Sequence, residues 1–198
     1  MRLVLGLGNP GERYAPTRHN VAWQVLETLA ERHGAARGEE CREYRTRRAR
    51  LAGDDVELMV PLTFMNASGD AVMEWRLRHG FDPATLLVVT DDVYLPLGAL
   101  RLRPGGSSGG HRGLESLEAA LASREYARLR VGVGTVGAAQ DSAALREHVL
   151  EDFAPDELPV LESMVRLAAD AVECWVARGT LAAMNQFNRR VRKEVSES

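Results

Sequence analysis

The chain has 198 residues, of which 45% are hydrophobic and 27% are charged, and its formal net charge is −3. This is the composition of an ordinary globular protein, and the length suits one domain with a substantial buried core. No apolar run reaches the roughly 18 residues of a membrane span, and the N-terminus lacks the pattern of a signal peptide. Cys41 and Cys174 fit neither a disulfide framework nor a metal knuckle. We therefore expect a cytoplasmic protein that does not attach to membranes.

Arginine supplies nearly all of the positive charge, because Lys193 is the single lysine among the 25 basic residues. The net charge argues against a general affinity for nucleic acid, but phosphate contacts depend on local patches rather than on net charge. The arginines gather in four places, at 42–50, 101–103, 124–130 and 189–192. Two interpretations stay open, a bias in the base composition of the gene and a locally basic face.

The predicted elements alternate between strands and helices along the chain. Apolar runs and period-two patterns predict strands over 2–7, 45–51, 56–61, 85–90, 99–103 and 128–134. Helical spacing predicts helices over 21–33, 68–79, 114–121, 156–177 and 181–190. Gly53-Asp54-Asp55 is expected to form a hairpin turn, and Ser68 to cap the second helix.

This alternation predicts a single-domain α/β fold, a three-layer sandwich in which helices flank a twisted, mixed and largely parallel sheet. We expect the domain to span residues 1–190, followed by a frayed tail over 191–198. In such folds, ligand sites gather at the carboxyl ends of the strands.

The glycines after the first strand match G-x-G-x-x-G at residues 6–11, a pattern best known from dinucleotide-binding folds. In those folds the second and third glycines open a helix whose N-terminus faces the pyrophosphate. Here the helical pattern begins only near Val21, after the polar stretch ERYAPTRHN. The acidic residue expected about 20 residues later is also missing, because Glu27 and Glu31 lie within the helix. The sequence therefore argues against a dinucleotide cofactor.

Polar side chains cluster where the predicted strands end: Asn9, His19, Asn20, Asn66, Asp91, Asp92 and His111. His19 lies in a polar segment between a strand and a helix, and Asp91 ends the most hydrophobic strand. A His–Asp pair without a serine or cysteine nucleophile turn favours activation of water, with the carboxylate fixing the imidazole tautomer. Asparagine side chains suit peptide-like substrates because each offers a donor and an acceptor. No pattern has zinc spacing, so the residues leave two alternatives, a metal-free hydrolase and a structural polar cluster.

Several ordered segments together resemble bacterial peptidyl-tRNA hydrolase: GLGNPGERYAPTRHN, VPLTFMNASG, LLVVTDDVYLPLGALRLRPGGSSGGHRGL and RLRVGVG. They extend from residue 3 to about residue 134, and the later NQFN fits the C-terminal helix of that family. The resemblance implies hydrolysis of the ester between a peptide and the terminal ribose of tRNA, which frees the tRNA for reuse. It also implies a monomer that uses neither metal nor cofactor and whose partner is peptidyl-tRNA.

The resemblance assigns roles to individual residues. His19 falls on the catalytic base and Asp91 on the carboxylate that orients it, and the glycine turn presents Asn9 beside them. The substrate groove would comprise Tyr14, Phe64, Met65, Asn66, His111 and Arg112. Arg103 and Arg130 fall where the family holds the tRNA 5′ phosphate, a ligand that a guanidinium fork fits well.

Arg112 is the clearest departure from the family, which usually has asparagine at this position, in GGHNGL. Arginine donates hydrogen bonds but cannot accept them, and its charge near His19 would make protonation of the imidazole harder. Alternatively, Arg112 could turn outward and meet an RNA phosphate. Two lesser departures are Thr90, where histidine is common, and Tyr94, where an acid is often found.

Two rival functions share the expected scaffold. One is a non-catalytic RNA-binding relative, for which Arg112 is the supporting feature. The other is a general nucleotide- or peptide-hydrolysing enzyme, which rests on architecture alone. The presence of His19, Asp91, Asn9 and Asn66 favours an active peptidyl-tRNA hydrolase.

Overall fold

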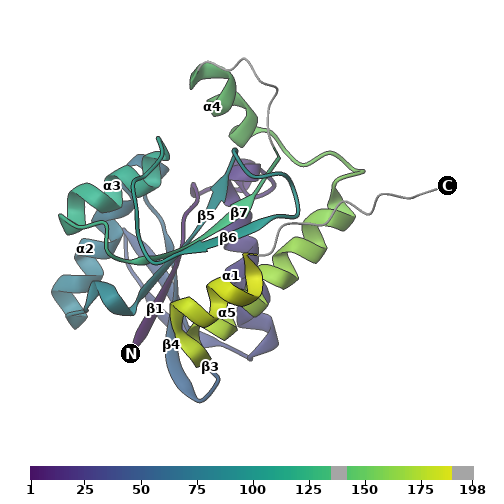
Figure 1. Cartoon of the computed structure of the whole chain (residues 1–198). Coiled ribbons are helices and arrows are strands. Elements are labelled where there is room, and N and C mark those ends of the chain that lie inside the picture. Colours follow the sequence, from purple (N-terminus) through teal and green to yellow (C-terminus); the bar gives the residue numbers. More distant parts are fainter. Residues whose placement is uncertain (135–141, 189–198) are drawn as a thin grey trace.

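The computed structural model describes residues 1–134 and 142–188, and one mixed sheet runs through its centre (Figure 1). Within these residues, seven strands lie in the order β2-β3-β4-β1-β5-β7-β6. Their bounds are Arg2–Gly6 (β1), Ala36–Glu40 (β2), Tyr44–Leu51 (β3), Asp54–Pro61 (β4), Leu86–Asp92 (β5), Leu100–Arg103 (β6) and Ala127–Gly132 (β7). β4, β1, β5 and β7 are parallel, whereas β3 and β6 run antiparallel to their neighbours. The predicted mixed and largely parallel sheet is confirmed.

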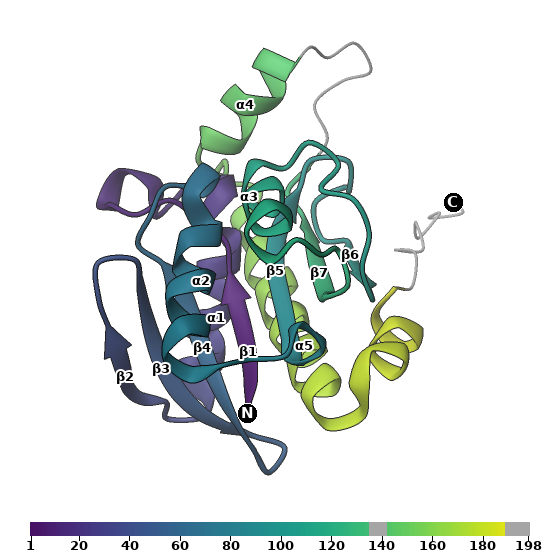
Figure 2. The same cartoon turned by 90° about the vertical axis from the view of Figure 1, so that its left-hand side faces the viewer.

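Helices cover both faces of this sheet, which gives the predicted three layers. The α-helices are Val21–Arg32 (α1), Ser68–His79 (α2), Arg112–Leu121 (α3), Ser142–Leu150 (α4) and Leu158–Phe187 (α5). Short 3-10 turns cover Glu12–Tyr14, Arg18–Asn20, Met65–Ala67 and Pro83–Thr85. α1 and α5 enclose one apolar core with the sheet, and α2 and α3 enclose the other. Figure 2 shows α2 and α3 on the near side of the sheet and α1 and α5 on the far side.

Two elements were not predicted from the sequence, β2 and α4. β2 is the edge strand, and its sequence ARGEE is too polar to show an apolar alternation. α4 follows the undescribed segment 135–141 and stands above the carboxyl ends of β5 and β7 (Figure 1). The predicted break at Gly179 is confirmed, because the non-helical φ of 80° and ψ of 176° at this residue kink α5 and divide it into two helical segments. The tail at 191–198 and the arginines at 189–192 lie outside the described residues.

The local expectations at two turns were wrong in detail. The hairpin turn is Ala52-Gly53, whose φ values are 51° and 93°, so Asp54 and Asp55 belong to β4. Two positive φ values in a two-residue loop match the right-handed twist of the flanking strands. Ser68 does not cap α2, because its hydroxyl donates to the carbonyl of Met65 at 2.9 Å.

The glycine motif after β1 has two different physical tasks. Gly11 has a φ of 106° and provides the expected sharp turn. Gly6 and Gly8 instead make room for α1, because a Cβ at Gly8 would lie 2.4 Å from Trp23 Nε1 and one at Gly6 would lie 3.0 Å from Leu26. Close packing of this helix brings the segment before it, which contains His19, to the end of β1.

The topology decides where polar residues converge. β4 and β5 flank β1 in parallel, and the connecting helices α1 and α2 lie on opposite faces of the sheet. The strand order therefore reverses around β1, and the loops after β1, β4 and β5 meet at one edge. In the described part of the chain, no helix has both the length and the apolar character needed to cross a membrane.

Candidate active site

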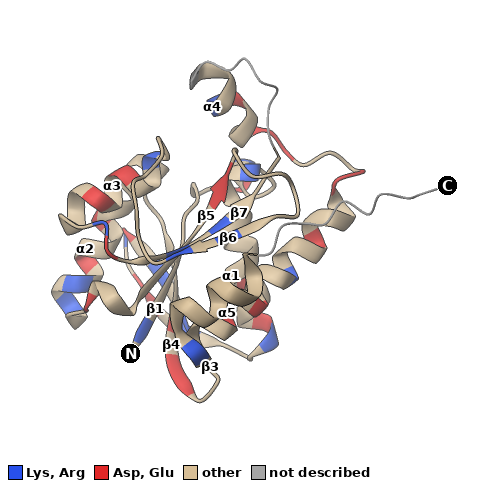
Figure 3. Ribbon diagram, viewed as in Figure 1, with Lys and Arg blue, Asp and Glu red and all other residues tan. Residues whose placement is uncertain are grey.

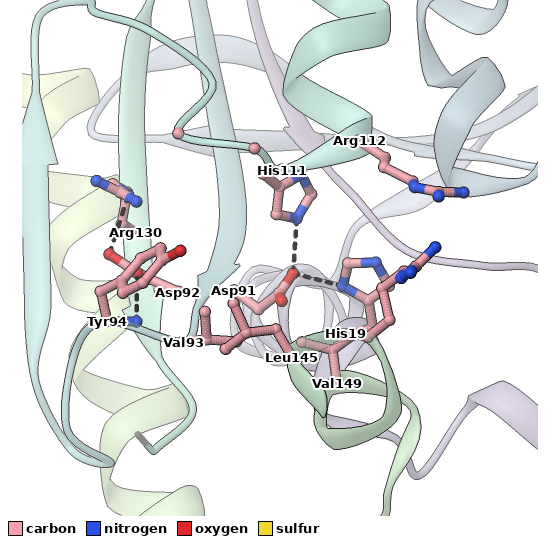
Figure 4. Close-up of a pocket in the computed structure, with 13 residues that line it drawn as sticks. His19, Asp91, Asp92, Val93, Tyr94, His111, Arg112, Arg130, Leu145 and Val149 are labelled. Atoms are coloured by element: carbon pink, nitrogen blue, oxygen red, sulfur yellow. Dashed lines mark hydrogen bonds and ion pairs between the residues drawn. The ribbon is translucent and has the colours of Figure 1, made fainter. Parts of the chain in front are cut away.

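The centre of this edge is a cluster of two histidines on one carboxylate (Figure 4). Asp91, the second-last residue of strand β5, has a side chain that is 1% exposed. Its Oδ1 lies 2.9 Å from His19 Nδ1 and 2.9 Å from His111 Nε2. His19 comes from the 3-10 turn before α1, and His111 precedes α3. The structure thus brings together residues that are distant in the sequence.

The tautomer of His111 is set by the start of α3. His111 is the N-cap residue of this helix, and its Nδ1 accepts hydrogen bonds from the backbone N–H groups of Gly113 and Leu114 at 3.1 and 3.3 Å. A ring nitrogen that accepts carries no proton, so the proton of neutral His111 is on Nε2. It points at Asp91 Oδ1 and at Thr90 Oγ1, which lies 2.8 Å from the same nitrogen.

The carboxylate of Asp91 therefore accepts from both rings. Burial acts to raise the pKa of Asp91, but electrostatic attraction and hydrogen bonds from His19 and His111 outweigh it and lower this pKa. An ionised Asp91 holds the proton of His19 on Nδ1. The lone pair of His19 Nε2 is then free to accept a proton.

The pKa of Asp92, the next residue, shifts in the opposite direction. Burial raises the pKa of Asp92, and the backbone N–H of Tyr94 and the charge of Arg130 offset only part of this effect. Asp92 Oδ1 accepts from Tyr94 N at 2.9 Å, and Oδ2 lies 3.0 Å from Arg130 Nε.

Two cavities meet at His19. The first, which we call the Tyr94 arm, has a volume of about 290 Å³, and the second, the Asn66 arm, has about 220 Å³. The Tyr94 arm is lined by Asp91, Asp92, Val93, Tyr94, Gly109, Gly110, His111, Arg130 and Leu145. The Asn66 arm is lined by Asn9, Phe64, Met65, Asn66 and Leu150. His19, Arg112, Arg146 and Val149 line both arms.

Asn9 lies in the Asn66 arm with most of its hydrogen-bonding capacity committed. Its Oδ1 accepts from Met65 N at 2.9 Å, and its backbone is tied to the Asn20 side chain through hydrogen bonds of 2.8 and 2.9 Å. From the sequence, we expect the Asn9 side chain to offer a ligand both a donor and an acceptor. Because a backbone N–H must meet the oxygen, only the Nδ2 donors of Asn9 remain for a ligand. Asn66 is exposed at the mouth of the same arm.

The three residues expected as groove walls have different environments. Phe64 is 56% exposed and lines the Asn66 arm. Met65 also lines it, although this side chain is 4% exposed and belongs to the core under α2 and α3. Tyr14 is outside the cavity lining and meets the ring of Phe64 edge-on at 6.4 Å. It therefore extends the aromatic surface beyond the arm.

The arginines expected to contact tRNA lie on adjacent strands. β6 and β7 pair so that Arg101 is opposite Arg130 and Arg103 is opposite Arg128, and this register places all four on one face of the sheet. Figure 3 shows the blue bands of basic residues on these two adjacent strands. Arg103 is exposed and lies outside both arms, whereas Arg130 lines the Tyr94 arm. Arg128 is buried and is occupied by the Ser107 carbonyl and by Glu118.

Arg112 is exposed at the junction of the arms, and its side chain forms no hydrogen bond or ion pair with any described residue. Figure 4 shows it extending away from Asp91 on the side of His19. Arg112 is therefore exposed at the rim of the site, a position from which its side chain can turn either inward to His19 or outward to RNA.

Two structural supports of the site, Arg18 and α4, were not predicted from the sequence. Arg18 is buried, donates to the Val133 carbonyl at 2.9 Å and pairs with Glu157 at 2.6 Å, which anchors the turn that carries His19. In the sequence it looks like any other arginine. α4 places Leu145 and Val149 over the arms, and this i, i+4 spacing is the signal that could have predicted the helix.

A family model described as peptidyl-tRNA hydrolase matches residues 3–196. The peptidyl-tRNA hydrolase of Chloroflexus aggregans is 44% identical to this chain, with 95% of the chain and 99% of the relative covered. That of Dehalococcoides mccartyi is 38% identical, with 95% and 100% covered. The crystal structure of peptidyl-tRNA hydrolase from Acinetobacter baumannii matches with a TM-score of 0.87 at 32% identity, covering 95% of this chain and 94% of that one. The chain therefore belongs to the peptidyl-tRNA hydrolase family of enzymes.

Proposed function

We propose that this protein hydrolyses the ester of peptidyl-tRNA by activating water with His19, without a metal, as a cytoplasmic monomer whose single domain is residues 1–190. The observation that carries the proposal is the hydrogen bond of 2.9 Å between His19 Nδ1 and Asp91 Oδ1. It leaves His19 Nε2 as a base at the junction of two dissimilar cavities. An ester whose two halves differ in chemistry fits such a junction.

The reaction follows from this geometry. Nε2 of His19 takes a proton from water, and the hydroxide attacks the ester carbonyl carbon. Asp91 stabilises the imidazolium that forms. The Nδ2 group of Asn9 donates to the carbonyl oxygen as negative charge develops on it. When the tetrahedral intermediate collapses, the ribose oxygen leaves with the proton from His19, so free peptide and free tRNA result.

The two arms suit the two halves of the substrate. The Asn66 arm combines amide groups with Phe64 and Leu150, which fits a peptide backbone and its side chains. The Tyr94 arm leads toward Arg130, and Arg103 lies beyond it on β6. Guanidinium groups bind phosphate oxygens with paired N–H donors, so we assign Arg103 and Arg130 to the tRNA 5′ phosphate.

The histidine cluster bears on the role of metal. One ligand atom from each of His19, Asp91 and His111 lies within 4.8 Å of the others, which is close enough for a divalent ion. However, His111 could coordinate through Nε2 only by losing its proton there while Nδ1 still accepts from the start of α3. That combination requires an imidazolate, which is far less available than neutral imidazole. The cluster is therefore better suited to holding protons than to holding a metal.

The rival function, RNA binding without catalysis, requires no base. The buried carboxylate and two oriented rings at the junction favour catalysis over a passive scaffold. His111 acts in this proposal as a positioning residue for Asp91.

Hydrolysis of peptidyl-tRNA by wild type, His19→Ala and His33→Ala tests the proposal, with and without a chelator. His33 hydrogen-bonds Glu173 of α5 and lies outside both arms, so it is a matched control. We expect His19→Ala to lose at least about a thousandfold in rate while its affinity for tRNA changes little. His33→Ala and the chelator should leave the rate unchanged. Near-normal hydrolysis by His19→Ala would contradict the mechanism.

A further inference from the structure

Tyr94 is an exposed aromatic residue held at a fixed place in the Tyr94 arm. It is 63% exposed, although large aromatic side chains usually bury most of their surface. Its backbone N–H donates to Asp92 Oδ1 at 2.9 Å, which anchors the turn after β5. Figure 4 shows its ring beside Arg130, on the side of the pocket away from His19. No described aromatic ring packs against it.

The surroundings of Tyr94 have the chemistry of a nucleotide site. Arg130 lines the same arm, and its Nε lies 3.0 Å from Asp92 Oδ2, the carboxylate whose other oxygen accepts from the backbone N–H of Tyr94. Gly109 and Gly110 line the same arm without side chains, and a Cβ at Gly109 would lie 3.7 Å from Arg130 Nη2. An aromatic face next to an arginine is the usual combination for binding a base and its phosphate.

The position of His19 restricts which nucleoside could reach the ring. The reacting ester joins the peptide to the terminal ribose, so the base on that ribose lies within one nucleoside of His19. The peptide occupies the Asn66 arm in the function proposed above, which leaves the Tyr94 arm for the base. We propose that Tyr94 is the stacking platform for the 3′-terminal base of the tRNA, an inference that rests on the proposed function.

The test compares two small esters of the same N-acetylated amino acid, one on adenosine and one on ribose without a base. We expect wild type to prefer the adenosine ester. Tyr94→Ala should lower kcat/KM for the adenosine ester about tenfold, since stacking contributes roughly this much per base, and should leave the base-free ester unchanged. Tyr94→Phe keeps the aromatic face and should behave like wild type.

The outcomes separate this inference from the proposed function. Equal losses on both esters, or no loss on either, would overturn the stacking role. A loss that follows the amino acid rather than the base would assign the arm to the peptide. If wild type hydrolyses neither ester nor peptidyl-tRNA, the proposed function fails instead. Titration with adenosine monophosphate, followed by the NMR signals of the Tyr94 ring, then tests stacking directly, and unmoved signals would refute it.

Discussion

The two arms of the site differ in how their polar groups are bound. In the Asn66 arm, the Asn9 oxygen is committed to Met65 N, and the other walls include Phe64 and Leu150. In the Tyr94 arm, a buried carboxylate holds Arg130 and the backbone of Tyr94. One arm therefore offers neutral donors and apolar surface, whereas the other offers positive charge and an aromatic face. His19 lines both arms, and in the proposed function it acts on an ester whose peptide and nucleotide halves occupy one arm each.

The same contrast exists between the consecutive carboxylates that end β5. Asp91 is stabilised as an anion by two histidines, and its pKa is lowered. Burial raises the pKa of Asp92, despite Arg130. A strand turns successive side chains in opposite directions, so adjacent residues can serve different sites. In the proposed function, Asp91 supports the catalytic base His19, and Asp92 supports the nucleotide side.

Substitution of the carboxylate under the base should have the largest effect. Asp91→Asn keeps the shape of the side chain but cannot stabilise the imidazolium, so we expect kcat to fall by about a thousandfold or more. Asp92→Asn is the matched control one residue away and should lower kcat by less than tenfold. Single-turnover hydrolysis of peptidyl-tRNA measures both. Similar losses in the two variants would remove the distinction between the carboxylates.

The pH dependence of stability separates the same pair. A lowered pKa means that Asp91 stabilises the fold above the ordinary value of 3.8 and that this contribution is lost as the pH falls. A raised pKa means that the contribution of Asp92 is present below 3.8 and is lost as the pH rises. Relative to wild type, the thermal stability of Asp92→Asn should therefore improve between pH 4 and 7. The stability deficit of Asp91→Asn should be fully present above about pH 5 and should shrink as the pH falls below 3.8, where wild type loses the contribution of Asp91.

The Asn66 arm is tested by substitutions that distinguish the Oδ1 acceptor of Asn9 from its Nδ2 donors. Asn9→Asp keeps an acceptor for Met65 N but removes the Nδ2 donors, so the fold should persist while kcat falls about a hundredfold. Asn9→Ala should lose both the rate and some thermal stability, because it leaves the N–H of Met65 without its acceptor. Full activity in Asn9→Asp would show that the amide does not donate to the substrate.

The Tyr94 arm and the arginines beyond it are tested by salt. Arg103→Ala and Arg130→Ala should each weaken tRNA binding about tenfold and reduce the slope of log K against log salt by roughly one. Arg37→Ala, on the exposed edge strand β2, removes a charge elsewhere and should leave the slope unchanged. The losses of binding and of salt slope in Arg103→Ala and Arg130→Ala should vanish with a substrate that lacks the 5′ phosphate. An equal loss of affinity with that substrate would show that Arg103 and Arg130 have a structural role instead.

The fold was predictable wherever the sequence carries a repeating apolar pattern. The buried run LLVV gives β5, and the spacing from Val21 to Leu29 gives α1. β2 has no such pattern, because as an edge strand it needs no buried face. The Ser68 error has a local cause, since the side chain reaches back to Met65 instead of capping α2.

The site residues were predictable as a set, but their connections were not. Strand ends indicate that His19 and Asp91 are near each other, because the carboxyl ends of parallel strands share an edge. That His111 also reaches Asp91 depends on the three-dimensional placement of α3. The commitment of the Asn9 oxygen to Met65 likewise joins residues 56 positions apart. Contacts of this kind leave no signal in the spacing of the residues.

The smallest expected effect belongs to Arg112, which borders both arms and so bears on the comparison between them. Its side chain is exposed and has no partner among the described residues, which favours contact with RNA over contact with His19. Arg112→Asn should therefore make the salt dependence of tRNA binding slightly shallower and weaken binding about threefold.

The acidic limb of the kcat/KM profile of Arg112→Asn provides the contrary test. If the arginine reaches inward, its removal makes protonation of His19 easier, so the acidic limb moves to higher pH. An outward arginine leaves that limb in place, because a charge in solvent is screened within a Debye length of about 10 Å. A shifted limb with an unchanged salt slope would place Arg112 beside the base. The residue would then tune catalysis at the junction of the arms, rather than extend the nucleotide side.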